Sequence, residues 1–210
     1  MPDQSYEESR WEIGESRVIG IDEAGRGPLA GPVSVAAVLL PQGYQLEGLH
    51  DSKKLSEKVR ERLCEHLIND ASVEWKHSFV GVDEIDQLNI LRATEAGMRE
   101  VATAIGKVDF AFIDGRPVKD FPVPSEGVVK GDGKVLSIAA ASIIAKVFRD
   151  REMVKCDKKY PDYGFAKHKG YGTKVHLDAL RRCGPCPLHR RSFRPVAEAE
   201  SLFAEKRASS

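Results

Sequence analysis

The feature that most constrains this chain is the stretch VIGIDEAGRGPLAGP at residues 18–32. It begins as an apolar run, typical of a buried strand, and then places Asp22 and Glu23 side by side before a turn rich in glycine and proline. Because neighbouring side chains of a strand point to opposite faces, the two acids can share a site only where the strand ends. The Gly-Arg-Gly sequence at 25–27 lets backbone N–H groups approach a ligand beside an arginine suited to phosphate. The stretch predicts a metal ion and a phosphate at one strand end; the alternative is a glycine-rich turn with solvated acids.

Two further acids follow predicted strands. Asp114 ends the strand predicted at 108–113, and Asp132 follows a weaker strand predicted at 123–130. Parallel strands joined by helical crossovers bring their C-terminal ends to one edge of a sheet. Taken singly, an Asp beside a Gly is a turn former. Taken together with the first stretch, the pattern predicts a convergent set of carboxylates: Asp22, Glu23, Asp114 and Asp132.

Four carboxylates so close together could not all stay ionised without a cation. Hard oxygen ligands favour Mg²⁺ or Mn²⁺ over zinc. Two such ions about 4 Å apart would activate water and stabilise the leaving oxygen in phosphodiester hydrolysis. A P-loop is excluded, because Val135 stands where a Ser or Thr would hold Mg²⁺ and Val128 stands where the first glycine belongs. The chain also lacks the Gly-x-Ser-x-Gly and His-Glu-x-x-His motifs of acyl transfer and zinc proteolysis.

Charge is distributed unevenly although the formal net charge is zero. Residues 1–15 contain five acids against one arginine. Residues 165–194 contain eight Lys or Arg and three His against one Asp, with three aromatic residues interleaved. Such a segment is typical of binding to a polyanion, and solvated surface charge is the alternative.

The length and the 41% hydrophobic content allow one large domain or two small ones. No apolar run approaches the roughly 18 residues of a membrane span, and the acidic N-terminus lacks a signal-peptide pattern. We therefore expect a cytoplasmic protein without a membrane partner. Residues 1–16 lack periodicity and are predicted to form a flexible, frayed tail, with some helix as the alternative.

Cys183 and Cys186 form a Cys-Gly-Pro-Cys sequence that looks like a redox motif. A thioredoxin-type site needs this sequence at the start of a helix directly after a strand, whereas here it follows a helical run at 175–182. No second Cys or His pair stands at zinc-finger spacing. We therefore expect neither redox function nor zinc binding, and whether the two cysteines pair stays open.

Periodicity predicts the remaining elements. A strand at 33–40 is close enough to the first strand, at 17–22, to pair antiparallel with it, and an alternating strand at 73–80 is expected at an edge of the sheet. Ser56 is a plausible N-cap for a helix. The other helices are predicted at 83–88, 90–105, 137–158, 174–182 and 196–208.

Several segments together closely resemble bacterial ribonuclease HII, the type 2 ribonuclease H family. They are GIDEAGRGPLAGPV (20–33), DSKKL (51–55), DG (114–115), KGD (130–132), SIAAASIIAKV (137–147) with RD (149–150), HKGYGT (168–173) and CPLHRRSF (186–193). These segments run from about residue 17 to 195 in the family's order.

The resemblance implies an α/β ribonuclease H-like fold, with a mixed five-stranded sheet flanked by helices and a helical C-terminal extension. We accordingly expect a single domain over 17–208, with a catalytic core to about 160 and a basic helical part over about 161–208. The implied reaction is metal-dependent endonucleolytic cleavage of RNA in RNA–DNA hybrids and on the 5′ side of ribonucleotides embedded in duplex DNA. It leaves 3′-hydroxyl and 5′-phosphate ends and implies a role in removing misincorporated ribonucleotides and RNA primers.

Carried over by position, the four acids look like the catalytic, metal-binding residues. The family implies Mg²⁺ or Mn²⁺, with one ion per monomer without substrate and a second with it. Residues 25–27 resemble a backbone clamp that senses the ribose 2′-hydroxyl, the group that marks a ribonucleotide within DNA. Tyr171 matches a tyrosine that packs on the sugar beyond the junction. The implied substrate-binding residues are Gly25, Arg26, Gly27 and Tyr171, with Lys53, Lys146, Arg190 and Arg191 as phosphate contacts.

Three other interpretations compete. Ribonuclease HIII carries a substantial N-terminal domain, and only 21 residues precede Asp22 here. A non-catalytic nucleic-acid-binding module would gain nothing from carboxylates that repel phosphate. A metal phosphatase acting on small substrates leaves the basic, aromatic C-terminal region unexplained. We therefore expect RNA–DNA hybrid and ribonucleotide-containing duplex DNA as partners of a monomeric enzyme.

Overall fold

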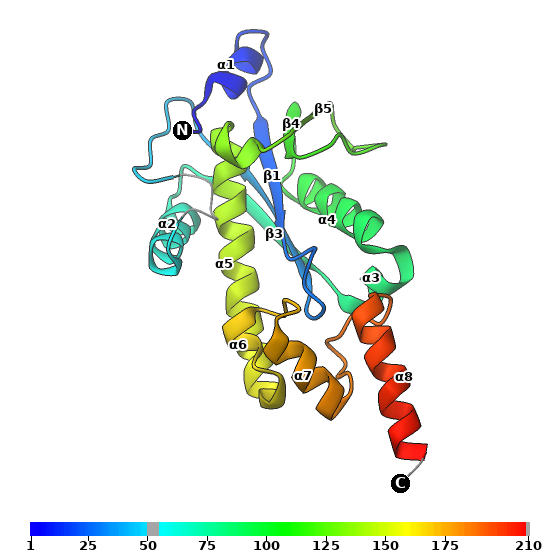
Figure 1. The fold of residues 1–210 in the computed structure, drawn as a ribbon. Coiled ribbons are helices and arrows are strands. Elements are labelled where there is room, and N and C mark those ends of the chain that lie inside the picture. The colour runs from blue at the N-terminus through cyan, green and yellow to red at the C-terminus, as the bar shows by residue number, and fades with distance from the viewer. Residues whose placement is uncertain (50–54, 209–210) are drawn as a thin grey trace. The chain divides into compact units, whose positions relative to one another are not determined.

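The computed structural model describes residues 1–49 and 55–208 (Figure 1). The chain divides into two compact units. The first, called the sheet unit here, comprises Met1–Ala24, Ser34–Phe79 and Glu95–Val147. The second, called the helical unit, comprises Gly25–Val33, Val80–Thr94 and Phe148–Ser210. The expectation was a single domain over 17–208 with a catalytic core to about residue 160 and a basic helical part after it. In the structure, the glycine-rich turn at 25–33 groups with the C-terminal helices.

The sheet has five strands of mixed direction in the order β3-β2-β1-β4-β5. β1 pairs antiparallel with β2 and parallel with β4, and β4 pairs parallel with β5. The strands are β1 (Val18–Ala24), β2 (Val33–Leu39), β3 (Glu74–Val80), β4 (Phe110–Asp114) and β5 (Ser125–Val128). The predicted fold class is confirmed, as are the predicted strand positions and the edge position of β3.

The helices match the predicted periodicity closely, with two additions. Ser56 is the predicted N-cap, since its Oγ accepts the N–H of Val59 at 3.4 Å. The α-helices are α1 (Ser5–Trp11), α2 (Glu57–Asn69), α3 (Val82–Leu88), α4 (Ile90–Ala104), α5 (Leu136–Lys159), α6 (Phe165–His168), α7 (Lys174–Cys183) and α8 (Arg194–Ala208). The short helix α6 was not predicted, and the sequence allowed some helix within residues 1–16 without placing α1.

The first half of α5 packs directly against β1 (Figure 1). A Cβ atom on Gly20 would lie 2.2 Å from backbone atoms of both Ser137 and Ile138, so only glycine permits this approach. The small apolar residues at 138–141 are fully buried. This confirms the expectation that the small apolar half of this helix packs tightly on the sheet.

The predicted flexible tail is wrong for the segment that forms α1. Glu7 is buried, and its Oε1 accepts hydrogen bonds from the N–H and the Oγ of Ser137, at 2.9 Å and 2.6 Å. The ring of Tyr6 meets that of Phe112 edge-on at 5.5 Å between centroids. The segment is therefore held at the start of α5 and on the sheet, although its two turns are too short to show a helical period in the sequence.

The helical unit has an apolar interior of its own. One cluster of buried side chains comprises Ala30, Met153, Cys156, Tyr163, Phe165, Ala179 and Cys186. A second comprises Leu29, Leu180, Val196 and Ala199. Leu29 and Ala30 thus anchor the glycine-rich turn within this unit. Over the described part of the chain, no helix has both the length and the apolar character needed to cross a membrane.

Candidate active site

The C-terminal ends of β1 and β4 carry three of the four predicted acids. The parallel register pairs Gly20 with Phe112 and Ile21 with Ile113, so Asp22 and Asp114 follow the last pair on neighbouring strands. Glu23 comes next in β1. The parallel sheet therefore brings these carboxylates to one edge, as predicted from the strand pattern.

Asp22 is buried beside other carboxylates, which affects its protonation. Its side chain is 4% exposed and accepts the N–H of Glu23 at 2.7 Å. Burial, followed by the negative charges of Glu23 and Asp114, raises the pKa of Asp22 well above its usual range, against the opposing hydrogen bond of Ser142. The proton that Asp22 tends to keep marks a place where a positive charge would be stabilising.

The fourth acid, Asp132, lies in a loop that is tied to Asp114. The N–H of Gly131 donates to Asp114 Oδ1 at 2.6 Å. A Cβ on Gly131 would lie 2.6 Å from Ile138 Cδ1 and 3.3 Å from the same carboxylate oxygen, so a larger residue here would have to displace the end of the Ile138 side chain. Asp132 follows in the 3₁₀ turn Gly131–Gly133 and is buried.

The start of the chain also holds this loop. Asp3 forms a parallel bridge with Val135, in which its N–H donates to the carbonyl of Lys134 at 3.2 Å and its carbonyl accepts from Leu136 at 3.0 Å. Together with Glu7 at the start of α5, this bridge fixes the segment that follows Asp132. No pattern in the sequence indicated this support, because Asp3 and Asp132 are far apart along the chain.

The donor set suits a hard divalent cation. Asp22, Glu23 and Asp114 offer only carboxylate oxygens, the ligands that Mg²⁺ and Mn²⁺ prefer, and their crowding favours a cation. Across residues 1–49 and 55–208, no three His, Cys, Asp or Glu side chains are grouped closely enough to hold one metal ion. The acids thus fit such an ion in chemistry and in shared location, without forming a finished coordination shell.

Arg190 lies beneath the glycine-rich turn and not where the sequence placed it. Its side chain is 0% exposed, and its five N–H donors all go to carbonyls of the turn. Nη1 donates to Arg26 at 2.9 Å and Pro28 at 2.8 Å. Nη2 donates to Gly25 at 2.6 Å and Gly31 at 2.8 Å, and Nε donates to Gly31 at 3.0 Å. The predicted phosphate contact of Arg190 is therefore wrong, because the guanidinium is buried and its donors are occupied.

A second buried arginine, Arg149, supports the other end of the turn. It donates to the carbonyls of Pro32 at 3.0 Å, Ala30 at 3.3 Å and Lys169 at 3.0 Å. A Cβ on Gly25, whose φ is +100°, would lie 1.9 Å from Arg149 Nε. The sequence showed Arg149 as one of several basic residues of a long helix, and nothing in that pattern distinguished it.

Tyr171 lies beside the glycine-rich turn. Its ring atom Cε1 is 3.6 Å from the position that a Cβ on Gly27 would occupy. The side chain is 47% exposed. Its carbonyl accepts from Thr173 N and lies 2.9 Å from His176 Nδ1, which fixes the backbone while the ring faces solvent. The structure thus brings Tyr171 and Gly27 together within the helical unit.

The other three predicted phosphate contacts are Lys53, Lys146 and Arg191. Lys53 lies outside the described residues. Lys146 is half-buried in α5. Arg191 is largely exposed and forms an ion pair with Glu200, and its backbone N–H donates to Asp86 at 2.8 Å. Phosphate contacts by Lys146 and Arg191 remain predictions.

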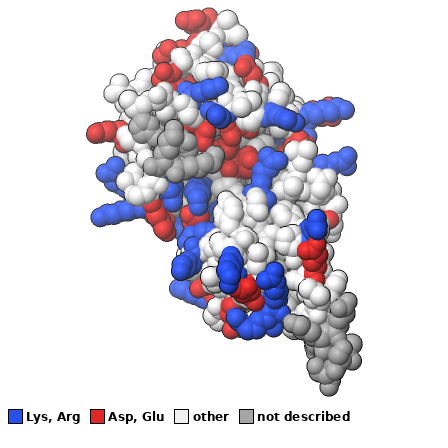
Figure 2. All heavy atoms as spheres, viewed as in Figure 1, with Lys and Arg blue, Asp and Glu red and all other residues white. Residues whose placement is uncertain are grey.

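Basic side chains of the helical unit gather over α6 and α7, with acidic side chains between them (Figure 2). Lys174 Nζ, for example, lies 3.0 Å from Asp178 Oδ2. The predicted basic segment is therefore partly neutralised within its own helix. Its binding to a polyanion stays a prediction.

Cys183 and Cys186 are both free thiols. Cys183 ends α7, and Cys186 is buried with its Sγ 3.2 Å from His189 Nδ1. Burial raises the pKa of the Cys186 thiol. The motif therefore stands at the end of a helix with a protonated thiol, the opposite of a thioredoxin-type site.

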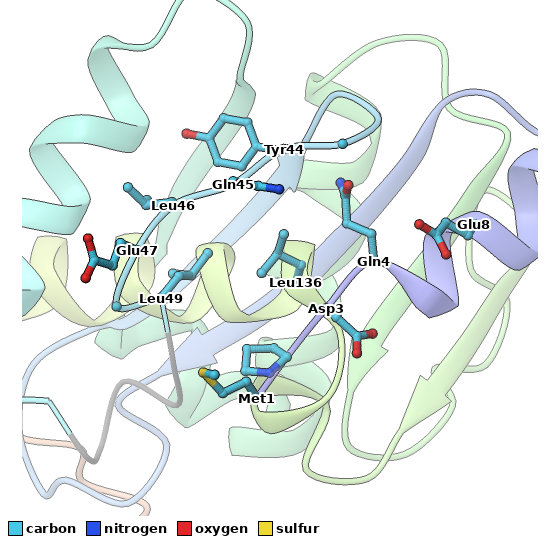
Figure 3. Close-up of a pocket in the computed structure, with 13 residues that line it drawn as sticks. Met1, Asp3, Gln4, Glu8, Tyr44, Gln45, Leu46, Glu47, Leu49 and Leu136 are labelled. Carbon is cyan, nitrogen blue, oxygen red and sulfur yellow. The ribbon is translucent and has the colours of Figure 1, made fainter.

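The sheet unit also contains a cavity of about 750 Å³ between the N-terminal residues, the loop at 43–49 and Leu136 (Figure 3). The side chains of Gln4 and Leu49 border it with Leu136. None of the predicted site residues that the structure describes lines this cavity. It is therefore separate from the carboxylates.

Comparison with known proteins identifies relatives over most of the chain. The model of the family described as ribonuclease HII matches residues 19–196. Ribonuclease HII of Acetivibrio thermocellus is 51% identical over 189 residues, which cover 90% of this chain and 73% of that protein. Ribonuclease HII of Chlamydia trachomatis serovar A is 51% identical over 197 residues, which cover 92% of this chain and 89% of that protein.

Solved structures show the same fold. Ribonuclease H2 from Pyrococcus horikoshii OT3 gives a TM-score of 0.75 at 26% identity, covering 90% of this chain and 99% of that one. Ribonuclease HII from Archaeoglobus fulgidus, solved in a complex with PCNA, gives 0.73 at 27% identity, covering 85% of this chain and 95% of that one. A ribonuclease HIII solved with Mn²⁺ gives 0.67 at 18% identity, covering 94% of this chain and 73% of that one, a likeness of fold alone.

Proposed function

Because the chain belongs to the ribonuclease HII family, we propose that the carboxylates at the sheet edge hydrolyse phosphodiester bonds of RNA paired with DNA. The chain is a ribonuclease H, an endonuclease among the hydrolases. The observation that carries the mechanism is the raised pKa of buried Asp22 beside Glu23 and Asp114. Three carboxylates compete there for one proton, and a divalent cation would replace it.

In this proposal Asp22, Glu23, Asp114 and Asp132 hold Mg²⁺ or Mn²⁺. When bound, the metal supplies positive charge for the scissile phosphate and for an attacking water. Asp22 acts as a buried anchor, since its carboxylate is oriented by the N–H of Glu23. Asp114 orients the loop that carries Asp132 through the N–H of Gly131. These hydrogen bonds pre-position the carboxylates before substrate arrives, which favours catalysis.

Recognition of the ribonucleotide falls to the helical unit. The backbone of residues 25–27 would hydrogen-bond the 2′-hydroxyl, and the exposed ring of Tyr171 beside Gly27 would pack on the neighbouring sugar. With the backbone of residues 25–27 on the ribose and Tyr171 on the neighbouring sugar, the protein would bind two substrates. They are RNA–DNA hybrid and duplex DNA with embedded ribonucleotides. Cleavage would fall on the 5′ side of the ribonucleotide and leave 3′-hydroxyl and 5′-phosphate ends. The proposed cellular role is the removal of misincorporated ribonucleotides and RNA primers by a cytoplasmic monomer.

A labelled DNA duplex with one ribonucleotide tests this proposal, with an all-DNA duplex as the control. Incubation with Mg²⁺ or Mn²⁺ should give one nick on the 5′ side of the ribonucleotide, and EDTA should abolish it. The new 3′ end should be extendable by a DNA polymerase, as a 3′-hydroxyl requires. Cleavage of long hybrids alone would reject the recognition role of residues 25–27 and Tyr171. No cleavage of either substrate with any metal would reject the proposal as a whole.

A further inference from the structure

The glycine-rich turn owes its shape to a side chain that is distant in sequence. Arg190 donates all five of its N–H groups to carbonyls at positions 25, 26, 28 and 31. The backbone N–H of Arg190 itself donates to the carbonyl of Leu29 at 2.9 Å. A lysine has three donors on one flexible nitrogen and cannot reproduce this planar fork.

The direction of the turn carbonyls fixes the direction of the next amide N–H groups. Every peptide bond that the structure describes here is trans, and in a trans peptide the C=O and the following N–H point in opposite directions. Because the carbonyls of Gly25 and Arg26 point to the Arg190 guanidinium, the N–H groups of Arg26 and Gly27 point away from it. Arg26 and Gly27 are both exposed, so these two adjacent donors are directed toward the accessible side of the turn.

The guanidinium also contributes charge. Burial, followed by the nearby positive charge of Arg149, lowers the pKa of Arg190 to about 9, so it stays charged at neutral pH. Two buried guanidinium groups therefore lie behind the turn. A positive charge behind a pair of N–H donors strengthens their attraction for an oxygen lone pair.

We propose that Arg190 is a positioning residue for recognition: it presents the N–H groups of Arg26 and Gly27 to the ribose 2′-hydroxyl. The proposal rests on the proposed function of residues 25–27. It adds the side chain that orients their backbone N–H groups for binding. Arg190 does not touch the substrate in this account. It acts through the turn, and its loss affects the choice between ribose and deoxyribose.

The test is a binding preference measured without turnover. Affinities for a duplex with one ribonucleotide and for the all-DNA duplex are measured by fluorescence anisotropy in EDTA. We expect Arg190→Lys to lower the ratio of the two affinities about tenfold, as the loss of one or two aligned hydrogen bonds would. The affinity for all-DNA duplex should be unchanged. A merely unstable protein would lose active fraction equally for both duplexes, which leaves the ratio intact.

The matched control is Arg99→Lys. Arg99 likewise donates to two loop carbonyls, those of Lys119 at 2.6 Å and Asp120 at 3.4 Å, but in the sheet unit. This variant should keep the wild-type ratio. An Arg190→Lys protein that binds with the wild-type ratio would overturn the inference.

A second measurement uses the unmodified protein and does not depend on the folding of a variant. The backbone amide resonances of Arg26 and Gly27 should shift when the ribonucleotide-containing duplex is added and should not shift with all-DNA duplex. If these resonances do not shift with the ribonucleotide-containing duplex, both the proposed recognition role and the inference are rejected. If the resonances shift but Arg190→Lys keeps the wild-type ratio of affinities, the inference alone is rejected.

Discussion

The sheet edge and the glycine-rich turn follow each other in sequence, yet they are built in opposite ways. The acids at the sheet edge stand at the ends of regular strands, and backbone ladders place them. The turn has no ladder of comparable length and is shaped by the side chains of Arg149 and Arg190. The sheet edge buries the carboxyl group of Asp22, whereas the turn lies against two buried guanidinium groups. The difference indicates that secondary structure places the acids, whereas side chains shape the backbone of the turn.

The largest expected effect is the loss of activity on Asp22→Asn. The amide keeps the shape of the carboxylate but removes a charge that would hold the metal, so the rate should fall by about 10³-fold or more. Folding should survive, because burial already disfavours the charged carboxylate. Cleavage rates with Mg²⁺ and Mn²⁺, together with circular dichroism, check this. Retained cleavage at high Mn²⁺ would contradict it.

Replacement of Arg190, which supports the turn, should instead lower the stability of the fold. Arg190→Met leaves the buried carbonyls of Gly25, Pro28 and Gly31 without their donor, and the free energy of unfolding should fall by about 3 kcal/mol or more. Arg99→Met is the control, because its carbonyl partners at Lys119 and Asp120 are exposed and water can replace the lost bonds. Urea unfolding of both variants provides the measurement. Equal decreases in the unfolding free energy of the two variants would show that burial of the carbonyls does not increase the cost of losing their donor.

The two regions should also respond to pH in opposite senses. Burial, followed by the neighbouring His176, lowers the pKa of His189 in the helical unit to about 4. The unfolded chain therefore binds a proton first, and stability should fall as pH drops from about 6.5 to 4, by up to about 3 kcal/mol. The raised pKa of Asp22 acts the other way, since its contribution is lost as pH rises.

Unfolding at a series of pH values tests the histidine part of this contrast. His189→Asn should flatten the fall in stability between about pH 6.5 and 4. His66→Asn is the control, because that side chain is 53% exposed and should leave the slope unchanged. Parallel curves for wild type and His189→Asn would show that His189 does not carry the effect.

A smaller effect is expected from the loop that carries Asp132. Gly131→Ala places a methyl group against Ile138 and the carboxylate of Asp114, which should cost about 1–3 kcal/mol and lower activity. Gly133→Ala is a close control, since its Cβ would meet nothing within 4 Å. Urea unfolding and cleavage rates should separate the two variants. Identical behaviour would show that the loop adjusts at no cost.

The sequence predicted the sheet edge well because the necessary signals are local. Each acid follows an apolar run of strand length, and parallel pairing then brings Asp22 and Asp114 together without further information. The fourth acid followed the weakest predicted strand, and its loop proved to depend on Asp3 and Gly131.

The support of the turn could not be predicted in the same way. Arg190 occurs in a basic run and was interpreted as a phosphate contact, because a sequence shows charge but not burial. Its carbonyl partner Gly25 lies 165 residues away. The N-terminal helix could not be placed for a related reason: Glu7 is stabilised by the start of α5, not by any periodicity of its own segment.

In the proposed division of roles, the sheet edge performs the chemistry while the turn performs the recognition. The decisive experiment measures the binding of Asp22→Asn to duplexes with and without one ribonucleotide, in parallel with cleavage. We expect cleavage to be lost while the ratio of the two affinities stays at the wild-type value. A variant that no longer distinguishes the two duplexes would contradict it, since recognition would then depend on the acids themselves.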